Sequence, residues 1–385
     1  MAARLLITGA GTGPGNNLIR SLRTGDPSLF IVGCNADRFF LKNSSAERNY
    51  LIPPLTYRAL PDVLGRIIEA ERVDLVIPTT DQDIRFLSGL RDEFPGRLFL
   101  PGKTVIDLCQ DKHDLTAFLR ARGVPAPVTF PVPAADGIEE VFGRFAPRSR
   151  LWCRMRAGSG SIGAIPVKSP EQARGWIRCW EAIRGVPAAS FILSEYLPGR
   201  DFSCQSLWLD GKLVLVKTCE RLSYLGPGNQ PSVVSSLGAL TKTVFEPEVA
   251  EIGAAAVRSL DERVSGAFSV DLKEDADGVP AVTEINAGRL SSGTNIFDLT
   301  GKHNMAITYV RLALGEPVDI SEEYDAAEGF YMLRDLDAVP AIVHAEELFT
   351  GIREVESEGS GGRFPQRMIR KEETRWATSH RRRAR

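Results

Sequence analysis

Residues 266–286 contain two β-strand patterns on either side of a turn signal. The first run, 266–273, alternates apolar and polar residues, and the second run, 279–286, is also rich in strand-forming residues. Asp277-Gly278, which lies between them, is typical of a two-residue hairpin turn. The stretch therefore predicts an antiparallel hairpin. In its first strand the alternation separates apolar Phe268, Val270 and Leu272 from polar Ser269 and Asp271.

A two-residue turn determines which residues of the hairpin face each other. It pairs Ala276 with Val279, and further along the ladder it places Asp271 directly opposite Glu284. Like charges opposed across a sheet repel each other. The arrangement is explained if a cation lies between the two carboxylates. Pro280 leaves the register open, because proline donates no hydrogen bond to the ladder.

The second strand of the hairpin supplies a further donor. Alternation places Val282, Glu284 and Asn286 on one face. Two carboxylates and the amide oxygen of Asn286 form an oxygen-only donor set, which suits Mg²⁺ (or Mn²⁺) with waters and phosphates completing the coordination. The hairpin therefore predicts a metal site of Asp271, Glu284 and Asn286. The alternative is an ordinary acidic hairpin on a solvated face.

Composition excludes several classes of protein. The chain has 385 residues and a net charge of -2, which argues against nucleic-acid binding by the whole molecule. Its six cysteines include no CxxC pair, so we expect reduced thiols in a cytoplasmic protein, without disulfides or a zinc site. The N-terminus lacks the organisation of a signal peptide, and no apolar run approaches the length of a membrane span. We therefore predict no nucleic-acid partner and no membrane.

The first hundred residues alternate between strand and helix patterns, which predicts a doubly wound parallel sheet. Strands are expected at 4–8, 29–34, 74–78 and 97–100. A glycine loop, 9–16, follows the first strand. It does not match GxGxxG, because Pro14 or Asn16 occupies the third glycine position, so a dehydrogenase is disfavoured. The backbone of Gly11 and Gly13 could bind an anion of the substrate, or the glycines could only make a tight turn.

Two segments in the middle of the chain carry basic residues beside phosphate-binding signals. A helix is expected over 111–122 with Asp111 as its N-cap, and Lys112 in its first turn is poorly placed for the helix dipole. A nearby phosphate would explain this placement, as would a solvated surface lysine. Residues 151–168 predict strand, glycine loop and strand, with Arg154 before the loop 157–163. The loop suits a lid over phosphates, or it is a plain hairpin loop.

The remaining pattern is coarser. We expect a strand at 191–198, a hairpin over 202–219 that turns at Asp210-Gly211, a mobile loop at 224–230, a helix over 246–263 and a helical run from 294 to 314. Lys217 or Arg221 could touch phosphate, or both could be surface charges of a strand and loop. Residues 353–363 and the basic tail 380–385 are expected to be flexible.

These pieces, in this order, resemble the ATP-grasp superfamily over about residues 1–315, in particular the large chain of carbamoyl phosphate synthetase and the carboxylate–amine ligases. The resemblance implies an α/β domain with a doubly wound parallel sheet, followed by an α+β ATP-grasp fold of two lobes that close on ATP. The expected divisions are 1–110 for the first domain, 111–200 for the small lobe and its lead-in, 201–320 for the large lobe with the magnesium site, and 321–385 for a C-terminal extension.

The resemblance also implies a role for individual residues. The carboxylate followed thirteen residues later by Glu-x-Asn matches Asp271, Glu284 and Asn286 as the metal set, and the arginine after it matches Arg289. That arginine is catalytic together with Arg154, although Ala287-Gly288 replaces a single proline of the synthetase pattern. Substrate contacts are expected at Ser291, Ser292, Gly293, Gly11 and Gly13. ATP-binding residues are expected at Lys112, Arg154, Gly160, Ser161, Glu195, Tyr196, Leu197 and Asp201.

The activity that the resemblance implies is ATP-dependent joining of a carboxylate to an amine through an acyl phosphate, with ADP and phosphate released. Its cofactors are ATP and Mg²⁺, and its partners are a small acid, a small amine and a second copy of the chain in a homodimer. Carboxyphosphate chemistry of the carbamoyl phosphate synthetase kind is an alternative, as is a regulatory nucleotide-binding module without turnover. The identity of the acid and of the amine cannot be inferred from these motifs.

Overall fold

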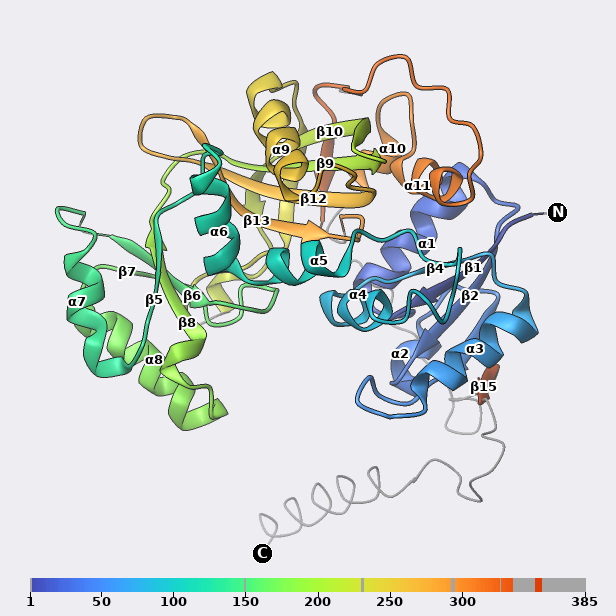
Figure 1. Cartoon of the computed structure of the whole chain (residues 1–385), viewed down its shortest axis with the longest axis horizontal. Coiled ribbons are helices and arrows are strands. Elements are labelled where there is room, and N and C mark those ends of the chain that lie inside the picture. The colour runs from blue at the N-terminus through green and yellow to red at the C-terminus, as the bar shows by residue number, and fades with distance from the viewer. Residues whose placement is uncertain are drawn as a thin grey trace, which may run out of the picture.

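The computed structural model describes residues 2–148, 150–229, 232–291, 295–325, 327–334 and 350–354. These residues form one parallel sheet and two antiparallel sheets, each covered by helices (Figure 1). None of the helices described has the combination of length and apolar character that crossing a bilayer requires. The expected flexible segment 353–363, apart from residues 353 and 354, and the basic tail 380–385 lie outside the described residues.

The parallel sheet comes first in the chain and has the strand order β15-β3-β2-β1-β4. Its apolar strands are buried on both sides, as expected for parallel strands between helices. The expected strand at 97–100 is wrong: the segment is linked to β4 by the hydrogen bond that the Arg97 carbonyl oxygen accepts from the Val76 N–H. The strands of the parallel sheet are β1 (Arg4–Thr8), β2 (Phe30–Asn35), β3 (Arg48–Leu51), β4 (Leu75–Ile77) and β15 (Ile352–Glu354). Its helices are α1 (Gly13–Gly25), α2 (Arg38–Lys42), α3 (Leu60–Glu71) and α4 (Asp81–Ser88).

Strand β1 lies between β2 and β4, so the order of the sheet reverses there. Two loops therefore leave the carboxyl ends of neighbouring strands side by side, the glycine loop after Thr8 and the segment from Pro78 to Thr80 after β4. Helices α5 (Lys103–Gln110) and α6 (Lys112–Ala121) then carry the chain to the second part of the molecule. Asp111 caps α6 as predicted, accepting from the His113 and Asp114 N–H groups.

The small antiparallel sheet, with the order β5-β8-β6-β7, lies at the opposite end of the molecule from the parallel sheet (Figure 1). Its own apolar core includes Phe145, Ile177 and Phe191. The predicted strand–loop–strand unit is confirmed, with Leu151 paired to Val167. Its elements are β5 (Thr129–Pro131), β6 (Leu151–Met155), β7 (Ile165–Val167), β8 (Phe191–Glu195), α7 (Ile138–Gly143) and α8 (Pro170–Arg184).

The six-stranded sheet, β13-β12-β9-β10-β11-β14, joins the two ends. One face packs on α5, α6 and α9 (Pro247–Leu260) around Phe268, Val270 and Leu272, the apolar face that alternation predicted. The other face packs through Leu207 and Leu215 on α1 and α11. Its strands are β9 (Asp201–Leu209), β10 (Lys212–Tyr224), β11 (Gly238–Thr243), β12 (Gly266–Glu274), β13 (Pro280–Ala287) and β14 (Tyr331–Leu333). The expected helical run to residue 314 is broken into α10 (Ile296–Leu299) and α11 (Met305–Ala313).

The hairpin of β12 and β13 differs from the prediction in its turn. Three residues, 276–278, separate Asp275 from Val279, whose carbonyl accepts the Asp275 N–H at 3.0 Å, so the two-residue turn is wrong. A β-bulge at Thr283 adds one residue to the second strand, and Asp271 still pairs with Glu284 as predicted. The bulge also turns Val282 into the apolar core, away from the face that was expected for it.

We predict that Gly11→Ala destabilises the first sheet. Gly11 has φ +83°, and an added Cβ would lie 1.7 Å from the Phe40 carbonyl oxygen. We expect a loss of at least about 2 kcal/mol in the free energy of unfolding, measured by urea titration. Gly13→Ala is the control, because no atom lies within 4 Å of the Cβ that alanine would add there. Equal stability of the two variants would contradict the packing of the loop on α2.

Candidate active site

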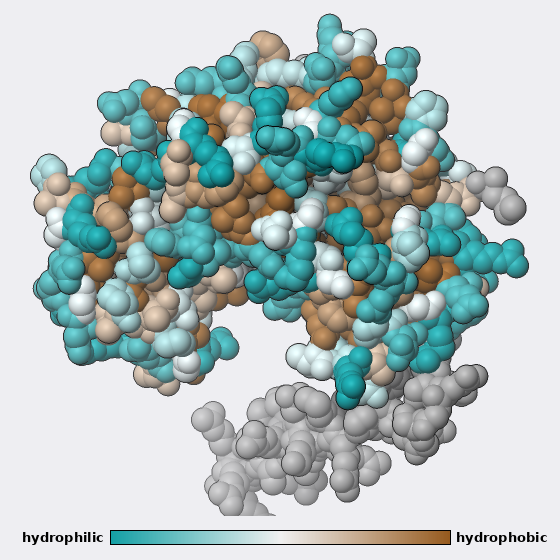
Figure 2. Space-filling view, viewed as in Figure 1, coloured by the Kyte–Doolittle hydropathy of each residue, from teal (hydrophilic) through white to brown (hydrophobic). Residues whose placement is uncertain are grey.

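A cavity of about 650 Å³ lies where the three sheets meet. Figure 2 shows a deep hollow between the end that carries α7 and α8 and the end that carries the parallel sheet. The wall is formed by side chains from β6, β8, β9, β10, β12 and β13 and from the loop after β4. The charged residues that line it are Asp81, Lys112, Arg150, Arg154, Glu195, Asp201, Arg221, Asp271, Lys273, Glu284 and Arg289.

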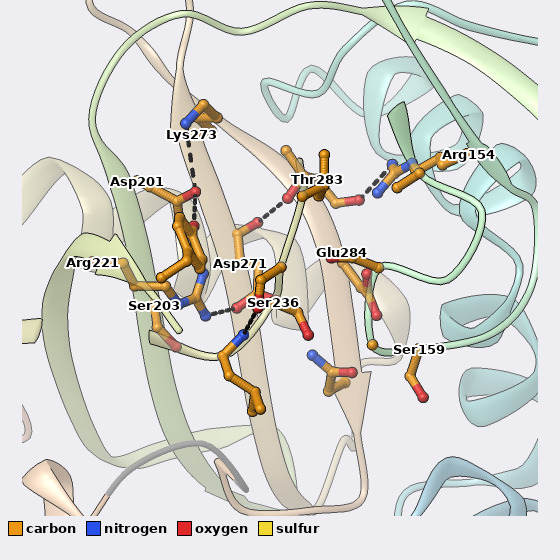
Figure 3. A pocket seen from close by; sticks show the side chains of 18 of the residues that line it. Arg154, Ser159, Asp201, Ser203, Arg221, Ser236, Asp271, Lys273, Thr283 and Glu284 are labelled. Carbon is orange, nitrogen blue, oxygen red and sulfur yellow. Dashed lines mark hydrogen bonds and ion pairs between the residues drawn. The ribbon is translucent and has the colours of Figure 1, made fainter. Parts of the chain in front are cut away.

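The three expected metal ligands line this cavity from one hairpin, and Figure 3 shows two of them, Asp271 and Glu284. Asp271 and Glu284 are directly paired across β12 and β13, and Asn286 is paired with Ser269 one step further along the face. Burial raises the pKa of the Asp271 carboxyl, and Arg221 offsets part of that effect. All three side chains offer oxygen, the donor that Mg²⁺ prefers. The residues therefore fit a divalent cation bound between the two carboxylates.

Lys112 connects the hairpin to the glycine loop. Its Nζ lies 3.6 Å from Glu284 Oε2 and donates a 2.5 Å hydrogen bond to the Gly158 carbonyl oxygen. The side chain is 8% exposed, which excludes the solvated surface lysine of the alternative interpretation. The ammonium group therefore lies between the loop and a proposed metal ligand, where a phosphate chain bound to the metal would pass.

Arg154 is buried beside the same carboxylates without pairing to them. Its Nη2 donates to the Thr283 carbonyl oxygen at 2.9 Å, at the bulge, and its buried Nε has no hydrogen-bond partner among the described residues. Burial lowers the pKa of Arg154, and the fields of Glu284 and Asp271 oppose that effect. A buried guanidinium with an unsatisfied donor is costly unless an anion completes its contacts. The geometry suits a phosphate oxygen of a bound nucleotide.

Arg221 links the two ends of the cavity wall, and Figure 3 shows it between two aspartates. Its Nη1 donates to Asp201 at 2.9 Å and its Nη2 donates to Asp271 at 2.5 Å. Burial acts to lower the pKa of Arg221, but the two carboxylates outweigh burial and hold the pKa above its usual value. Tyr224 and Lys273 also contact Asp201, at 2.5 Å and 3.5 Å. Arg221 therefore couples Asp201, one of the expected ATP-binding residues, to Asp271 of the expected metal set.

Lys217, the other residue considered for phosphate contact, faces away from the cavity. Its Nζ pairs with Asp325 at 3.0 Å and donates to the carbonyl oxygens of Thr300 and His303. Asp325 accepts in turn from the Lys302 N–H. Lys217 therefore ties the six-stranded sheet to the segment between α10 and α11.

Three of the expected ATP-binding residues line the cavity at the junction of the small sheet and the large one: Glu195, Tyr196 and Leu197. Glu195 ends β8 and accepts from the Val128 N–H at 2.6 Å, and Arg148 also pairs with it. The ring of Tyr196 lies 6.4 Å from that of Trp152. Leu197 is buried beside them. An apolar slot with one carboxylate at its edge suits a nucleobase with an exocyclic amine.

The loop between β6 and β7 contributes Gly158, Ser159, Gly160, Ser161 and Ile162 to the cavity wall. Ser161 has φ +56°, an unusual value for a residue with a side chain. Ile162 is 58% exposed, so the tip of the loop is not packed on the rest of the chain. Gly160 and Ser161 thus line the cavity, and their contact with phosphate stays a prediction.

The residues expected to contact substrate do not all lie at the cavity. Arg289 and Ser291 line the cavity, and the Ser291 N–H donates to Gln205 Oε1 at 2.5 Å. Ser292 and Gly293 lie outside the described residues. Gly11 and Gly13 are not among the described residues that line the cavity, and the glycine loop contributes Pro14. The tight approach of the loop to α2 directs it away from the site.

The sequence interpretation missed a group of lining residues at the carboxyl end of β4, and it also missed Lys273. Asp81 lies there, with its Oδ1 2.9 Å from the Arg289 Nε. A buried strand followed by polar residues was the available signal, since ligands of doubly wound sheets bind at strand ends. The alternation that exposes Asp271 also places Lys273 on the same face. The missed residues of the β4 end are Thr79, Thr80 and Asp81.

Solved structures of enzymes share this architecture at low sequence identity. An L-amino acid ligase from Bacillus licheniformis has a TM-score of 0.63 and 16% identity, covering 81% of this chain and 74% of that chain. The biotin carboxylase domain of 2-oxoglutarate carboxylase from Hydrogenobacter thermophilus, in complex with MgADP and bicarbonate, has a TM-score of 0.65 and 15% identity, covering 86% and 73%. Carboxyaminoimidazole ribonucleotide synthase from Aspergillus clavatus, complexed with ATP, has a TM-score of 0.62 and 15% identity, covering 84% and 80%.

No protein-family model matches the sequence, and a search of curated proteins finds no match. The structural neighbours are ATP-grasp proteins, and the chain has the ATP-grasp fold that its motifs predicted. At these identities the likeness establishes the fold.

We predict that Glu284→Gln and Asp271→Asn each remove the magnesium-dependent part of the stabilisation by ATP. With ligand at about a hundred times its dissociation constant, Mg–ATP adds roughly 2.7 kcal/mol to the stability of the unsubstituted protein. The melting temperature is measured with ATP, with and without Mg²⁺. Asp277→Asn, at the exposed turn of the same hairpin, is the control. An unchanged magnesium effect in both site variants would contradict the metal assignment.

Proposed function

We propose that the protein is an ATP-dependent ligase that phosphorylates a carboxylate and joins it to an amine, with release of ADP and phosphate. The observation that carries this proposal is the convergence of three oxygen donors and three cationic side chains on one cavity wall. The donors are Asp271, Glu284 and Asn286, and the cations are Lys112, Arg154 and Arg289. A nucleotide slot lies beside them, at Glu195 to Leu197.

The arrangement supplies what phosphoryl transfer needs. Asp271, Glu284 and Asn286 would hold Mg²⁺, which screens the charge of the terminal phosphates when it is bound. Lys112 and the unsatisfied donor of Arg154 face the same region and can bind phosphate oxygens. The adenine slot anchors the opposite end of ATP. A carboxylate entering from the side of the parallel sheet therefore meets the terminal phosphate first.

Arg289 is the residue best placed to act on the reacting groups. Its Nη2 donates to Asn286 Oδ1 at 2.5 Å, at the edge of the metal set, and its Nε contacts Asp81 at 2.9 Å. A carboxylate oxygen attacks the terminal phosphorus, the bond to ADP breaks, and negative charge spreads over the transferred group. Arg289 can stabilise that charge, and afterwards the acyl phosphate, while an amine attacks the acyl carbon and phosphate leaves.

Closure of the mobile parts would protect the acyl phosphate from water. The loop 157–163 and the segment from Val233 to Leu237 both line the cavity. Val233 is 67% exposed and Leu237 is 47% exposed, so both apolar side chains are available to pack on a bound ligand. We therefore expect these residues to form new contacts when a nucleotide binds.

The reaction class is tested by product analysis. With the true acid and amine we expect ADP and phosphate in equal amounts for each amide bond, and no AMP, because the metal set and Arg289 lie at the terminal phosphates. With acid present and hydroxylamine as the amine, a hydroxamate should accumulate. AMP as the stoichiometric product would contradict the mechanism. Hydroxamate-free turnover that requires bicarbonate would instead favour carboxyphosphate chemistry.

We predict that Arg289→Gln lowers kcat for ADP formation by about a hundredfold to a thousandfold, the loss usual for a donor to transition-state charge. The KM for ATP should change much less, because adenine and phosphate contacts remain. Arg178→Gln is the matched control, since Arg178 is exposed on α8 and pairs with Asp136 at 2.8 Å. A kcat within threefold of the control would remove Arg289 from the catalytic step.

A further inference from the structure

Asp81 brings a carboxylate to the cavity from the first sheet, opposite the metal hairpin. It is the first residue of α4 and follows β4, at the point where the order of the parallel sheet reverses. Its side chain is 24% exposed and lines the cavity. Such reversal points are where doubly wound sheets bind small ligands. The place in the fold therefore suits substrate recognition.

The backbone around Asp81 is held rigidly. Thr79 Oγ1 donates to the Thr8 carbonyl oxygen at 2.8 Å, and Thr8 Oγ1 donates to Asp83 at 2.9 Å. Gln110 donates to the Asp81 carbonyl oxygen at 2.8 Å. A Cβ at Gly9 would lie 2.5 Å from Thr79 Oγ1, so the two loops are packed as closely as the backbone allows. The backbone that carries the Asp81 carboxylate is thus held in place before any ligand binds.

Among the described residues, Arg289 is the ion-pair partner of Asp81. One guanidinium group spans from Asp81 to the amide oxygen of Asn286. In the proposed reaction Arg289 turns to the phosphoryl group and the acyl phosphate. Asp81 is then left as a partly buried anion without a cation beside it, which is costly. A positive group on the substrate would restore the pairing.

We propose that Asp81 binds the ammonium group of an amino acid whose carboxylate is the group phosphorylated by ATP. This inference rests on the proposed ligase function. An α-amino acid carries its carboxylate one carbon from its ammonium group. Both ends then fit the interval that Arg289 spans, with the ammonium at Asp81 and the carboxylate toward the metal hairpin. The ammonium group of the substrate then replaces Arg289 as the ion-pair partner of Asp81.

The competing explanation gives Asp81 a positioning role only. The N-terminus of α4 favours a carboxylate in its first turn, and the ion pair would then serve to orient Arg289. In that case loss of the charge affects the activation of every acid to the same degree. In the substrate-binding role, the loss falls on acids that carry an ammonium group. The two roles are therefore separable by pairs of substrates.

The experiment measures hydroxamate formation with Mg–ATP and hydroxylamine for the common L-amino acids and for the matching acids without the amino group. Alanine is matched by propionate, and phenylalanine by 3-phenylpropionate. The variants are Asp81→Asn and Asp81→Glu, with Asp136→Asn as the control, because Asp136 is an exposed aspartate paired with an arginine outside the cavity. The melting-temperature shift with Mg–ATP checks that each variant folds and binds nucleotide.

We expect one or more amino acids to be activated by the unsubstituted protein, and their deamino partners to be at least tenfold poorer in kcat/KM. Asp81→Asn should lower kcat/KM for the amino acid at least tenfold and leave that of the deamino acid within threefold, while Asp81→Glu recovers part of the loss. Deamino acids activated as well as amino acids, or equal losses for both, would overturn the role of Asp81 and leave the ligase function standing. If no acid of either set forms a hydroxamate, the ligase function fails and this inference fails with it.

Discussion

The pairing of Asp271 with Glu284 is the constraint around which the cavity is organised. Two carboxylates are held opposite each other on neighbouring strands of a sheet, where like charges repel. Burial raises the pKa of Asp271, and the neighbouring Glu284 carboxylate raises it further. Cationic side chains from other elements offset the repulsion. Arg221 contacts Asp271, and Lys112 lies near Glu284. Tertiary packing must bring both cationic side chains to the carboxylates, since neither residue lies on the hairpin.

The positions of the charged side chains in the cavity depend on how the two faces of the six-stranded sheet pack. One face buries Phe268 and Val270 against α6 and α9, which brings Lys112 at the start of α6 to the hairpin of β12 and β13. The other face packs on α1 and α11 and so attaches the parallel sheet, whose β4 loop carries Asp81. Because one face is apolar and buried while the other is polar where it lines the cavity, a shift of register by one residue would expose apolar side chains. The position of the site is therefore a consequence of the core.

Several charged groups of the cavity are paired internally in ways that a bound substrate would change. Arg289 joins Asp81 to Asn286, and Arg221 joins Asp201 to Asp271. Such pairs hold donors and acceptors near the positions they need, so little reorganisation is required when phosphates and a carboxylate arrive. Arg154 differs, because its Nε is already buried without a partner. These arrangements support the proposed binding of anionic ligands in the cavity.

The sequence by itself determined the order of the elements and the apolar face of 266–273, because these follow from local alternation. It also predicted the opposition of Asp271 to Glu284, although from a two-residue turn that the structure replaces with a longer turn and a bulge. It could not place Asp81 beside Arg289, since their contact joins residues 208 positions apart. Nor could it distinguish Arg221 from Lys217: both lie on β10, and only packing directs one to the cavity and the other to Asp325. The bulge at Thr283 was likewise decided in three dimensions, where it offset a longer turn and kept the carboxylates paired. Local patterns specify which groups can meet, and long-range burial decides which of them do.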